Sequence, residues 1–131
     1  MTVLVGVDFQ EIDEVRESIE TFGDRFVRRI YTDDEIADCR GDAMASAPGL
    51  ASRFAAKEAV FKILKDGDGV ATWHDIEVRL ESGQPALTLH GDAATLAARQ
   101  GITTLFVSLT QTRGTAAAVV VAESATGGSD R

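Results

Sequence analysis

Cysteine, proline and aromatic residues are scarce in this chain. Its 131 residues include one cysteine, two prolines, one tryptophan and one tyrosine. A single cysteine, Cys39, excludes an intrachain disulfide framework and fits a reducing cytosol. Neither histidine lies near Cys39 in the sequence to lower its pKa, so we expect a semi-buried apolar filler rather than a nucleophile.

Long apolar runs and an excess of basic charge are also missing. No run approaches the roughly 18–20 residues of a membrane span, and the first residues resemble a strand rather than a signal peptide. Lysine and arginine total 13 against 21 acidic residues, a formal net charge of -8. This balance argues against nucleic-acid binding as the main function. We expect a cytoplasmic protein with neither nucleic acid nor a membrane as its partner.

Several common site motifs are absent. The glycines form neither GxGxxG nor GxxxxGK[ST], so no nucleotide-binding loop of those types is present. His74 and His90 lack the spacing of zinc ligands, and Ser108 does not lie in a GxSxG elbow. Zinc chemistry and hydrolysis by a serine nucleophile are therefore disfavoured.

The length fits one domain, because domains most often contain about 100–150 residues. We expect residues 1–123 to form it and residues 124–131 to be a flexible tail. Alternating and helical patterns predict an α+β fold, a mainly antiparallel sheet packed on helices, with one long buried central helix over about 48–65. Strands are expected at 2–8, 73–81, 86–89, 103–110 and 115–123, the second and third as a hairpin, and the last as a central strand. Shorter helices are expected at 11–22, 32–40 and 91–100, the second of them beginning with a capping box of Thr32 and Glu35, and a loop is expected at 41–48.

The first strand is expected to be internal and to end on a carboxylate, Asp8. Gly6 shares the face of Asp8 and leaves room there for a ligand or for another backbone. Asp8 either caps the helix that follows, whose expected buried stripe is Ile12, Val15, Ile19 and Phe22, or belongs to a site.

The central helix carries charge within an apolar sequence, RFAAKEAVFK at residues 53–62. Lys57 projects into the same sector as the large apolar residues, so it must pair, reach solvent or hold a charged ligand. Glu58 and Lys62 lie one turn apart and can form a surface ion pair. If Asp8 and Glu58 converge, the two carboxylates suit a hard cation such as Mg²⁺.

A basic segment follows the first helix. In residues 25–30, Phe26 and Ile30 are expected to face inward while Arg25 and Arg29 project together. On an acidic protein such a patch is either a docking site for an acidic partner or a solvated surface cluster.

Five stretches together resemble one family. VGVD at 5–8, RFAAKEAVFK at 53–62, DIEV at 75–78, GQP at 83–85 and VSLT at 107–110 occur in the order and spacing of the holo-acyl-carrier-protein synthases. These are the small, single-domain class of 4'-phosphopantetheinyl transferases, and the likeness covers about residues 2–122.

The resemblance implies a fold, an activity and an assembly. The fold would be that of the 4'-phosphopantetheinyl transferases, in a homotrimer with active sites between subunits. The activity would be Mg²⁺-dependent transfer of the 4'-phosphopantetheine of coenzyme A to a serine of an apo acyl carrier protein, releasing adenosine 3',5'-bisphosphate. The proton of that serine would pass to a water on the metal, which we favour, or to Glu58.

The resemblance also implies roles for individual residues. Asp8 and Glu58 match the metal ligands and, with Lys62, the catalytic residues. Coenzyme A would contact Arg53, Lys62, Pro85, Ser108, Thr110 and Gln111. The carrier protein would dock on Arg16, Arg25, Phe26, Arg29 and Phe54.

Two features depart from the family pattern. Gln111 stands where the family usually has histidine, and glutamine cannot carry charge or shuttle a proton. The first helix carries Glu14, Glu17 and Glu20, which would partly repel an acidic carrier. The alternatives are therefore a non-catalytic homologue that binds coenzyme A or a carrier protein, or a trimeric structural protein that retains only the fold.

Overall fold

The computed structural model describes residues 1–39 and 46–125. The elements in chain order are β1 (Thr2–Glu11), α1 (Ile12–Phe22), α2 (Asp24–Ile30), α3 (Asp33–Cys39), α4 (Ala47–Ile63), the 3-10 turn η1 (Trp73–Asp75), β2 (Ile76–Glu81), β3 (Gln84–Leu89), α5 (Gly91–Arg99), β4 (Ile102–Gln111) and β5 (Thr115–Ser124). The α+β class and the antiparallel pairing agree with the prediction. The expected loop at 41–48 falls mostly outside the described residues, and within it Ala47 and Pro48 begin α4. Of the expected tail, residues 126–131 also lie outside them, whereas Ser124 ends β5.

The larger sheet has three antiparallel strands in the order β1-β5-β4. β5 is central, as its apolar sequence predicted. β1 pairs along its whole length with β5 and with no other described strand. The expectation of an internal first strand was therefore wrong. The residues of β1 alternate between two faces of the strand, and the outer face is exposed.

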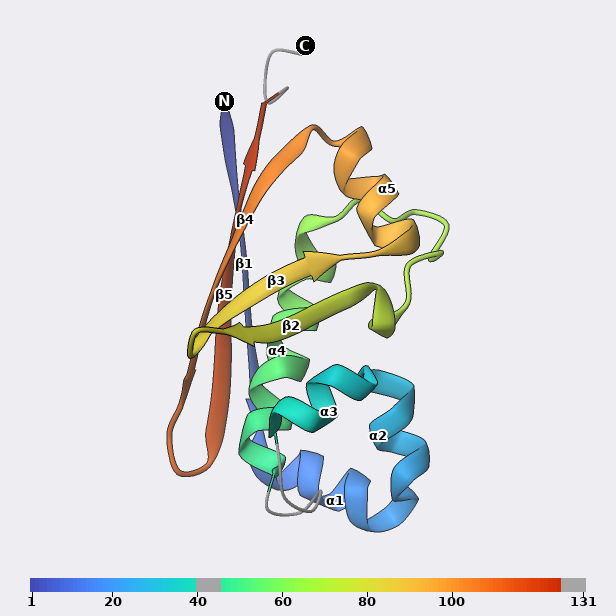
Figure 1. Ribbon diagram of the computed structural model, residues 1–131, viewed down its shortest axis with the longest axis vertical. Helices are drawn as coiled ribbons and strands as arrows, with labels where there is room; N and C mark the ends of the chain where they lie inside the picture. Colours follow the sequence, from blue (N-terminus) through green and yellow to red (C-terminus); the bar gives the residue numbers. More distant parts are fainter. Residues whose placement is uncertain (40–45, 126–131) are drawn as a thin grey trace.

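Small residues allow α4 to lie close against the inner face of this sheet (Figure 1). β5 presents Ala116, Ala118 and Ala122, all fully buried or nearly so. On β1, a side chain at Gly6 would place its Cβ 2.2 Å from the carbonyl oxygen of Ala59 on α4. Of the two possibilities raised for the space beside Gly6, another backbone is the correct one. This close approach brings the carboxyl end of β1 beside α4.

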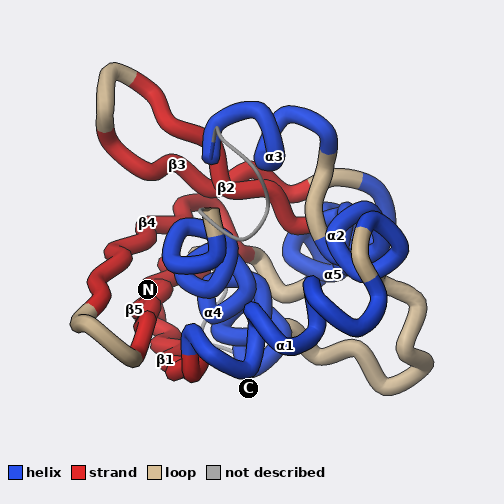
Figure 2. Tube along the Cα trace, turned by 90° about the horizontal axis from the view of Figure 1, so that it is seen from below, coloured by secondary structure: helices blue, strands red, loops and turns tan. Residues whose placement is uncertain are grey.

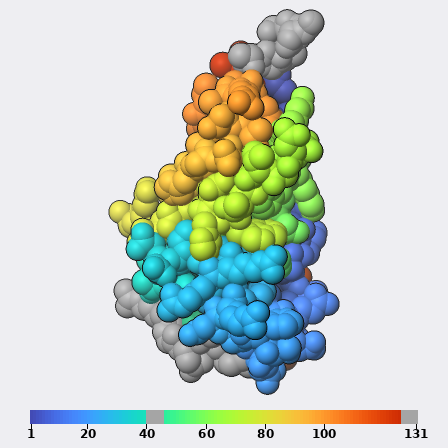
Figure 3. All heavy atoms as spheres, turned by 90° about the vertical axis from the view of Figure 1, so that its right-hand side faces the viewer, coloured from blue at the N-terminus to red at the C-terminus, as the bar shows by residue number. Residues whose placement is uncertain are grey.

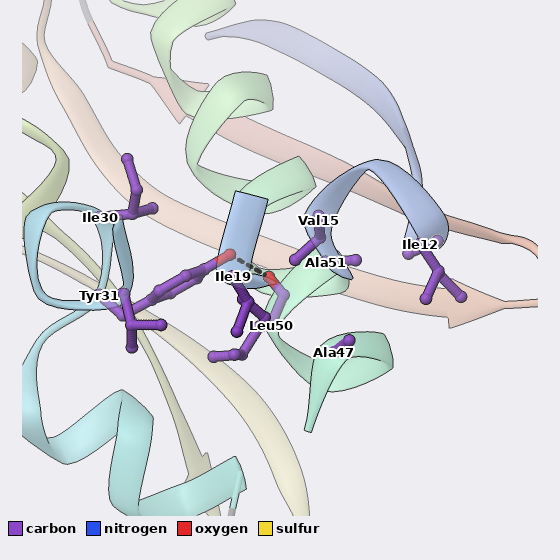
Figure 4. Packing of buried hydrophobic residues seen from close by; sticks show 10 residues of the cluster. Ile12, Val15, Ile19, Ile30, Tyr31, Ala47, Leu50 and Ala51 are labelled. Atoms are coloured by element: carbon purple, nitrogen blue, oxygen red, sulfur yellow. Dashed lines mark hydrogen bonds between the residues drawn. The ribbon is translucent and has the colours of Figure 1, made fainter. Parts of the chain in front are cut away.

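Helices α1 to α3 form a second group around the first half of α4. Viewed along the long axis, α4 lies between the sheet and α1 (Figure 2). Ile12, Val15 and Ile19 of α1 are buried against α4, and the hydroxyl of Tyr31 donates to the carbonyl of Leu50 at 2.7 Å (Figure 4). Phe22, expected in this stripe, is 59% exposed, and it is the last residue of α1 before the C-cap Gly23.

The smaller sheet is the hairpin β2–β3, confirmed by its antiparallel pairing. The strand begins at Ile76 rather than Trp73, because residues 73–75 form η1 with a capping box from Thr72 and Asp75. Leu80, expected to be buried, is exposed near the tip of the hairpin. The tip is Ser82–Gly83, both with positive φ, as two-residue hairpin turns require.

The outer face of the larger sheet carries a group of exposed apolar side chains. In Figure 1 no described helix lies on this side of the sheet. The group consists of Val3, Val5, Val7, Phe9, Phe106 and Val119. Such a patch is typical of a protein–protein contact. Separately, none of the helices within residues 1–39 and 46–125 is long and apolar enough to cross a membrane.

Candidate active site

Asp8 and Lys62 meet where β1 passes α4. The Lys62 ammonium lies 3.1 Å from Oδ1 of Asp8 and donates to the carbonyl of Val7 at 2.7 Å. Oδ2 of Asp8 accepts a hydrogen bond from Nε2 of Gln10 at 2.7 Å. Asp8 does not cap α1, since the N-cap is Glu11 and no side chain caps that end. Its carboxylate is mostly buried, with 14% of the side chain exposed, and faces the helix.

Glu58 lies one turn before Lys62 on α4 and belongs to the same group. Burial raises the pKa of Glu58, the negative charge of Asp8 raises it further, and the charge of Lys62 opposes both. Lys62 forms its ion pair with Asp8, not the expected surface pair with Glu58. The structure thus brings the three predicted catalytic residues, Asp8, Glu58 and Lys62, to one place.

This arrangement suits a hard divalent cation. Two neighbouring carboxylates repel each other, and a cation between them would relieve that repulsion. Among residues 1–39 and 46–125 no three His, Cys, Asp or Glu side chains come together as a metal-binding group. The donor set therefore fits Mg²⁺ with one or two protein carboxylates and the remaining positions filled by water and phosphate, rather than a cage made of protein alone.

A cleft of about 640 Å³ opens beside Glu58. Phe61 of α4 and Trp73 of η1 form an aromatic wall, with ring centroids 5.2 Å apart. Phe54 also packs against Trp73, with ring centroids 5.2 Å apart. Arg29 of α2 lines the cleft together with Glu58. The cleft therefore combines an apolar wall with one cationic and one anionic side chain.

The basic residues of α2 border a second, smaller hollow of about 290 Å³ on the helical end of the molecule. Its lining is Phe22, Arg25, Phe26 and Arg29. Arg29 lines both hollows, so the basic surface adjoins the cleft of Glu58. Arg16, also predicted for this surface, forms an ion pair with Asp13 at 2.9 Å.

Other predicted site residues do not lie beside Asp8, Glu58 and Lys62. Ser108 and Thr110 of β4 are exposed on the outer face, in register through β5 with Val7 and Phe9. Gln111 lies in the row of Gln10 at the far edge of the sheet. Pro85 is the second residue of β3, close to the hairpin tip.

Arg53 also lies apart from the three catalytic candidates. Its side chain is 5% exposed and donates to the carbonyl of Gly49 at 3.2 Å. Burial raises the pKa of Cys39 and the pKa of Tyr31, and the positive charge of Arg53 opposes both shifts. Arg53 is thus directed toward α3. No contact of Arg53 with Asp8 or Glu58 is seen.

A buried ion pair escaped the sequence analysis. The Lys57 ammonium lies 2.8 Å from Oε1 of Glu35, and both side chains are fully buried. Glu35 had been assigned to a capping box, which its contact with the Thr32 amide confirms, but its Oε2 also accepts from the amide of Val78. Lys57 had been flagged as needing a partner. Glu35 lies 22 positions away in the sequence, so local spacing did not identify it.

Comparison with known proteins gives one consistent family. Residues 4–120 match the model of the 4'-phosphopantetheinyl transferase superfamily. The chain is 46% identical over 127 residues to the holo-[acyl-carrier-protein] synthase of Nitratidesulfovibrio vulgaris strain DP4, covering 95% of this chain and 100% of that protein. It is 42% identical over 125 residues to the Koribacter versatilis holo-[acyl-carrier-protein] synthase, covering 94% and 99%. The Helicobacter pylori holo-[acyl-carrier-protein] synthase, solved in complex with coenzyme A, superimposes with a TM-score of 0.79 at 27% identity, covering 92% of this chain and 100% of that one.

Proposed function

The chain belongs to the holo-acyl-carrier-protein synthase family of 4'-phosphopantetheinyl transferases, and from this premise we propose the reaction that it performs. It transfers the 4'-phosphopantetheine group of coenzyme A to a serine hydroxyl of an apo acyl carrier protein and releases adenosine 3',5'-bisphosphate. The observation that carries the proposal is the meeting of Asp8, Glu58 and Lys62 at the contact between β1 and α4.

Asp8 and Glu58 are proposed to hold Mg²⁺ together with the diphosphate of coenzyme A. When bound, the ion neutralises charge on the diphosphate as the phosphoryl group is transferred. The hydrogen bond from Gln10 orients the Asp8 carboxylate, so that Oδ1 faces Lys62.

Lys62 provides a second positive charge beside the diphosphate. The carbonyl of Val7 and the carboxylate of Asp8 hold its ammonium in place, although 54% of the side chain is exposed. Because the ammonium is positioned before substrate binds, little reorganisation is needed as charge develops.

Glu58 is the proposed proton acceptor among the side chains of the cleft. Its pKa is raised by burial and by the charge of Asp8 in the metal-free protein, but a cation held by Glu58 would weaken it as a base. A water on the metal therefore stays the favoured acceptor, with Glu58 as the alternative. The carrier serine would reach Glu58 from the side of Arg29, whose basic surface suits an acidic partner.

The remaining predicted contacts support an assembly of three subunits with active sites between them. Ser108 and Thr110 face away from Asp8 within one subunit, on the same face as the exposed valines and Phe106. A neighbouring subunit packed on this face would bury the patch and bring such residues toward another subunit's cleft. Arg53, Pro85 and Gln111 are proposed to contact coenzyme A in that assembly.

The test is intact-mass spectrometry of an apo acyl carrier protein incubated with the protein, coenzyme A and Mg²⁺. The carrier should gain the mass of one phosphopantetheine. Asp8→Ala should abolish the gain, and Gln111→His should preserve it. Gain with Gln111→His alone would instead identify the natural protein as a non-catalytic homologue.

A binding measurement separates loss of metal from loss of fold. Mg²⁺ together with coenzyme A should raise the melting temperature of the natural protein, because ligands that bind only the native state stabilise it. The melting temperature of Asp8→Ala should not respond. An equal response of both proteins would contradict the assignment of Asp8 as a metal ligand.

A further inference from the structure

Turn η1 forms the wall of the cleft that faces α2. Trp73 and His74 of this turn line the cleft together with Glu58 of α4 and Arg29 of α2. The turn therefore stands between the helix that carries the proposed catalytic glutamate and the helix that carries the basic docking surface. In Figure 3 the segment that contains η1 lies directly against the surface of α2 and α3.

Hydrogen bonds from Lys57 link η1 to α4. Its ammonium donates to the carbonyl of Trp73 at 3.0 Å and to the carbonyl of Ile76, while it pairs with Glu35. Because this ammonium is fully buried, losing a carbonyl would leave one of its N–H groups without an acceptor, and losing Glu35 would leave its charge uncompensated. η1 is accordingly held rigidly on the side of α4.

A hydrogen bond from His74 links the same turn to α2. Its Nε2 lies 2.7 Å from the carbonyl oxygen of Arg28, so this nitrogen carries a proton and donates it. The carbonyl belongs to the last turn of α2, where helical carbonyls have no partner within the helix. Arg29, which reaches both hollows, is the next residue.

We propose that His74 is a positioning residue for the carrier protein: through the carbonyl of Arg28 it fixes α2, and with it Arg29, beside the Glu58 cleft. This rests on the proposed function, in which Arg29 contacts the carrier. The proposed contacts of coenzyme A with Asp8, Glu58 and Lys62 do not involve His74.

Steady-state kinetics with varied carrier and varied coenzyme A tests the proposal. His74→Ala should raise the KM for the apo carrier about three- to fivefold, as expected for loss of one exposed hydrogen bond. The KM for coenzyme A should stay within about twofold, since binding at Asp8, Glu58 and Lys62 is untouched. His74→Gln, whose amide can still donate to Arg28, should restore most of the lost affinity. His90→Ala is the matched control, because His90 is also exposed and hydrogen bonded, to Glu77, but lies outside the cleft.

A double-mutant cycle distinguishes positioning from direct contact. If His74 acts through Arg29, His74→Ala should have almost no further effect on the carrier KM in an Arg29→Ala background. Additive effects would show that His74 acts on the substrate independently and would overturn the proposal.

Trp73 emission provides a second readout, because Trp73 is the only tryptophan of the chain. If Lys57 holds η1, the emission maximum should be unchanged in His74→Ala. A shift would show that η1 itself moves, which contradicts the proposal.

Absence of transfer by the natural protein would contradict the proposed function. Transfer with an unchanged carrier KM in His74→Ala would contradict this inference alone.

Discussion

Glu58 illustrates at the scale of one residue how a site can oppose stability. Burial and the charge of Asp8 both favour its protonated form, so the pKa of Glu58 lies above the ordinary value of 4.5. Between the unfolded and folded pKa values the native state binds more protons than the unfolded chain. The free energy of unfolding therefore falls as pH rises through this window, and the full loss of stability is reached above the folded pKa.

Replacing Glu58 by glutamine should accordingly stabilise the metal-free protein, but only at higher pH. Urea unfolding at about pH 8 should give Glu58→Gln a larger free energy of unfolding than the natural protein, and the gain should vanish at about pH 4. Glu17→Gln, which changes an exposed carboxylate on α1, should show no such pH-dependent gain. An equal gain by Glu58→Gln at both pH values would contradict this account of the site.

At the scale of elements, periodicity predicted which segments form helices and strands better than it predicted their surroundings. The stripe of Ile12, Val15 and Ile19 was found because its spacing repeats with the helical turn. Phe22 continued the pattern but is exposed as the last residue of α1, and Leu80 alternates correctly but lies near an exposed hairpin tip. Whether the last apolar residue of a helix or strand is covered by a neighbouring element depends on tertiary packing, which the local sequence does not determine.

The proximity of the candidate site residues was predicted to a similar extent. Asp8, Glu58 and Lys62 came from motifs whose spacing is local or shared with a family. The partner of Lys57 was not predicted, because the capping box already accounted for Glu35. Only the packing of α3, α4 and β2 shows that the same carboxylate also contacts Lys57 and the amide of Val78.

The contact of β1 with α4 depends on Gly6. In Gly6→Ala the new Cβ would lie 2.2 Å from the carbonyl oxygen of Ala59, so the strand and the helix must separate. We expect a loss of at least about 1–3 kcal/mol in the free energy of unfolding, and a loss of transfer activity as Asp8 moves from Glu58. Gly114→Ala is the control, since nothing lies within 4 Å of a Cβ there. Denaturant unfolding and the mass assay measure the two effects, and an unaffected Gly6→Ala would show that this contact is not tight.

The Glu35–Lys57 pair joins α3, α4 and β2. Lys57→Met should lower the free energy of unfolding by about 3–5 kcal/mol, because it leaves the Glu35 carboxylate buried without its counter-charge. Adding Glu35→Gln should recover part of the loss, since no buried charge remains and the amide oxygen can still accept one backbone hydrogen bond. Urea titration of both variants measures this. A double variant less stable than Lys57→Met would contradict the explanation.

At the scale of the whole molecule, the outer sheet face is the proposed subunit interface. Phe106→Lys places a charge among exposed valines and should convert a trimer to monomers in sedimentation or light-scattering measurements. Val70→Lys changes another exposed apolar residue, between α4 and η1 and away from this face, and should leave the proposed trimer intact. A natural protein that is monomeric at working concentration would contradict the interface.

The two faces of the sheet have a genetic consequence in the proposed trimer. Asp8 lies on the inner face, whereas Ser108 and Thr110 lie on the outer face, so a mixed trimer can draw the two sets from different chains. Coexpression of an Asp8 variant with a variant lacking both hydroxyls would then form some sites that contain no substituted residue. Two alleles that are each inactive alone would complement one another, although neither encodes a functional enzyme.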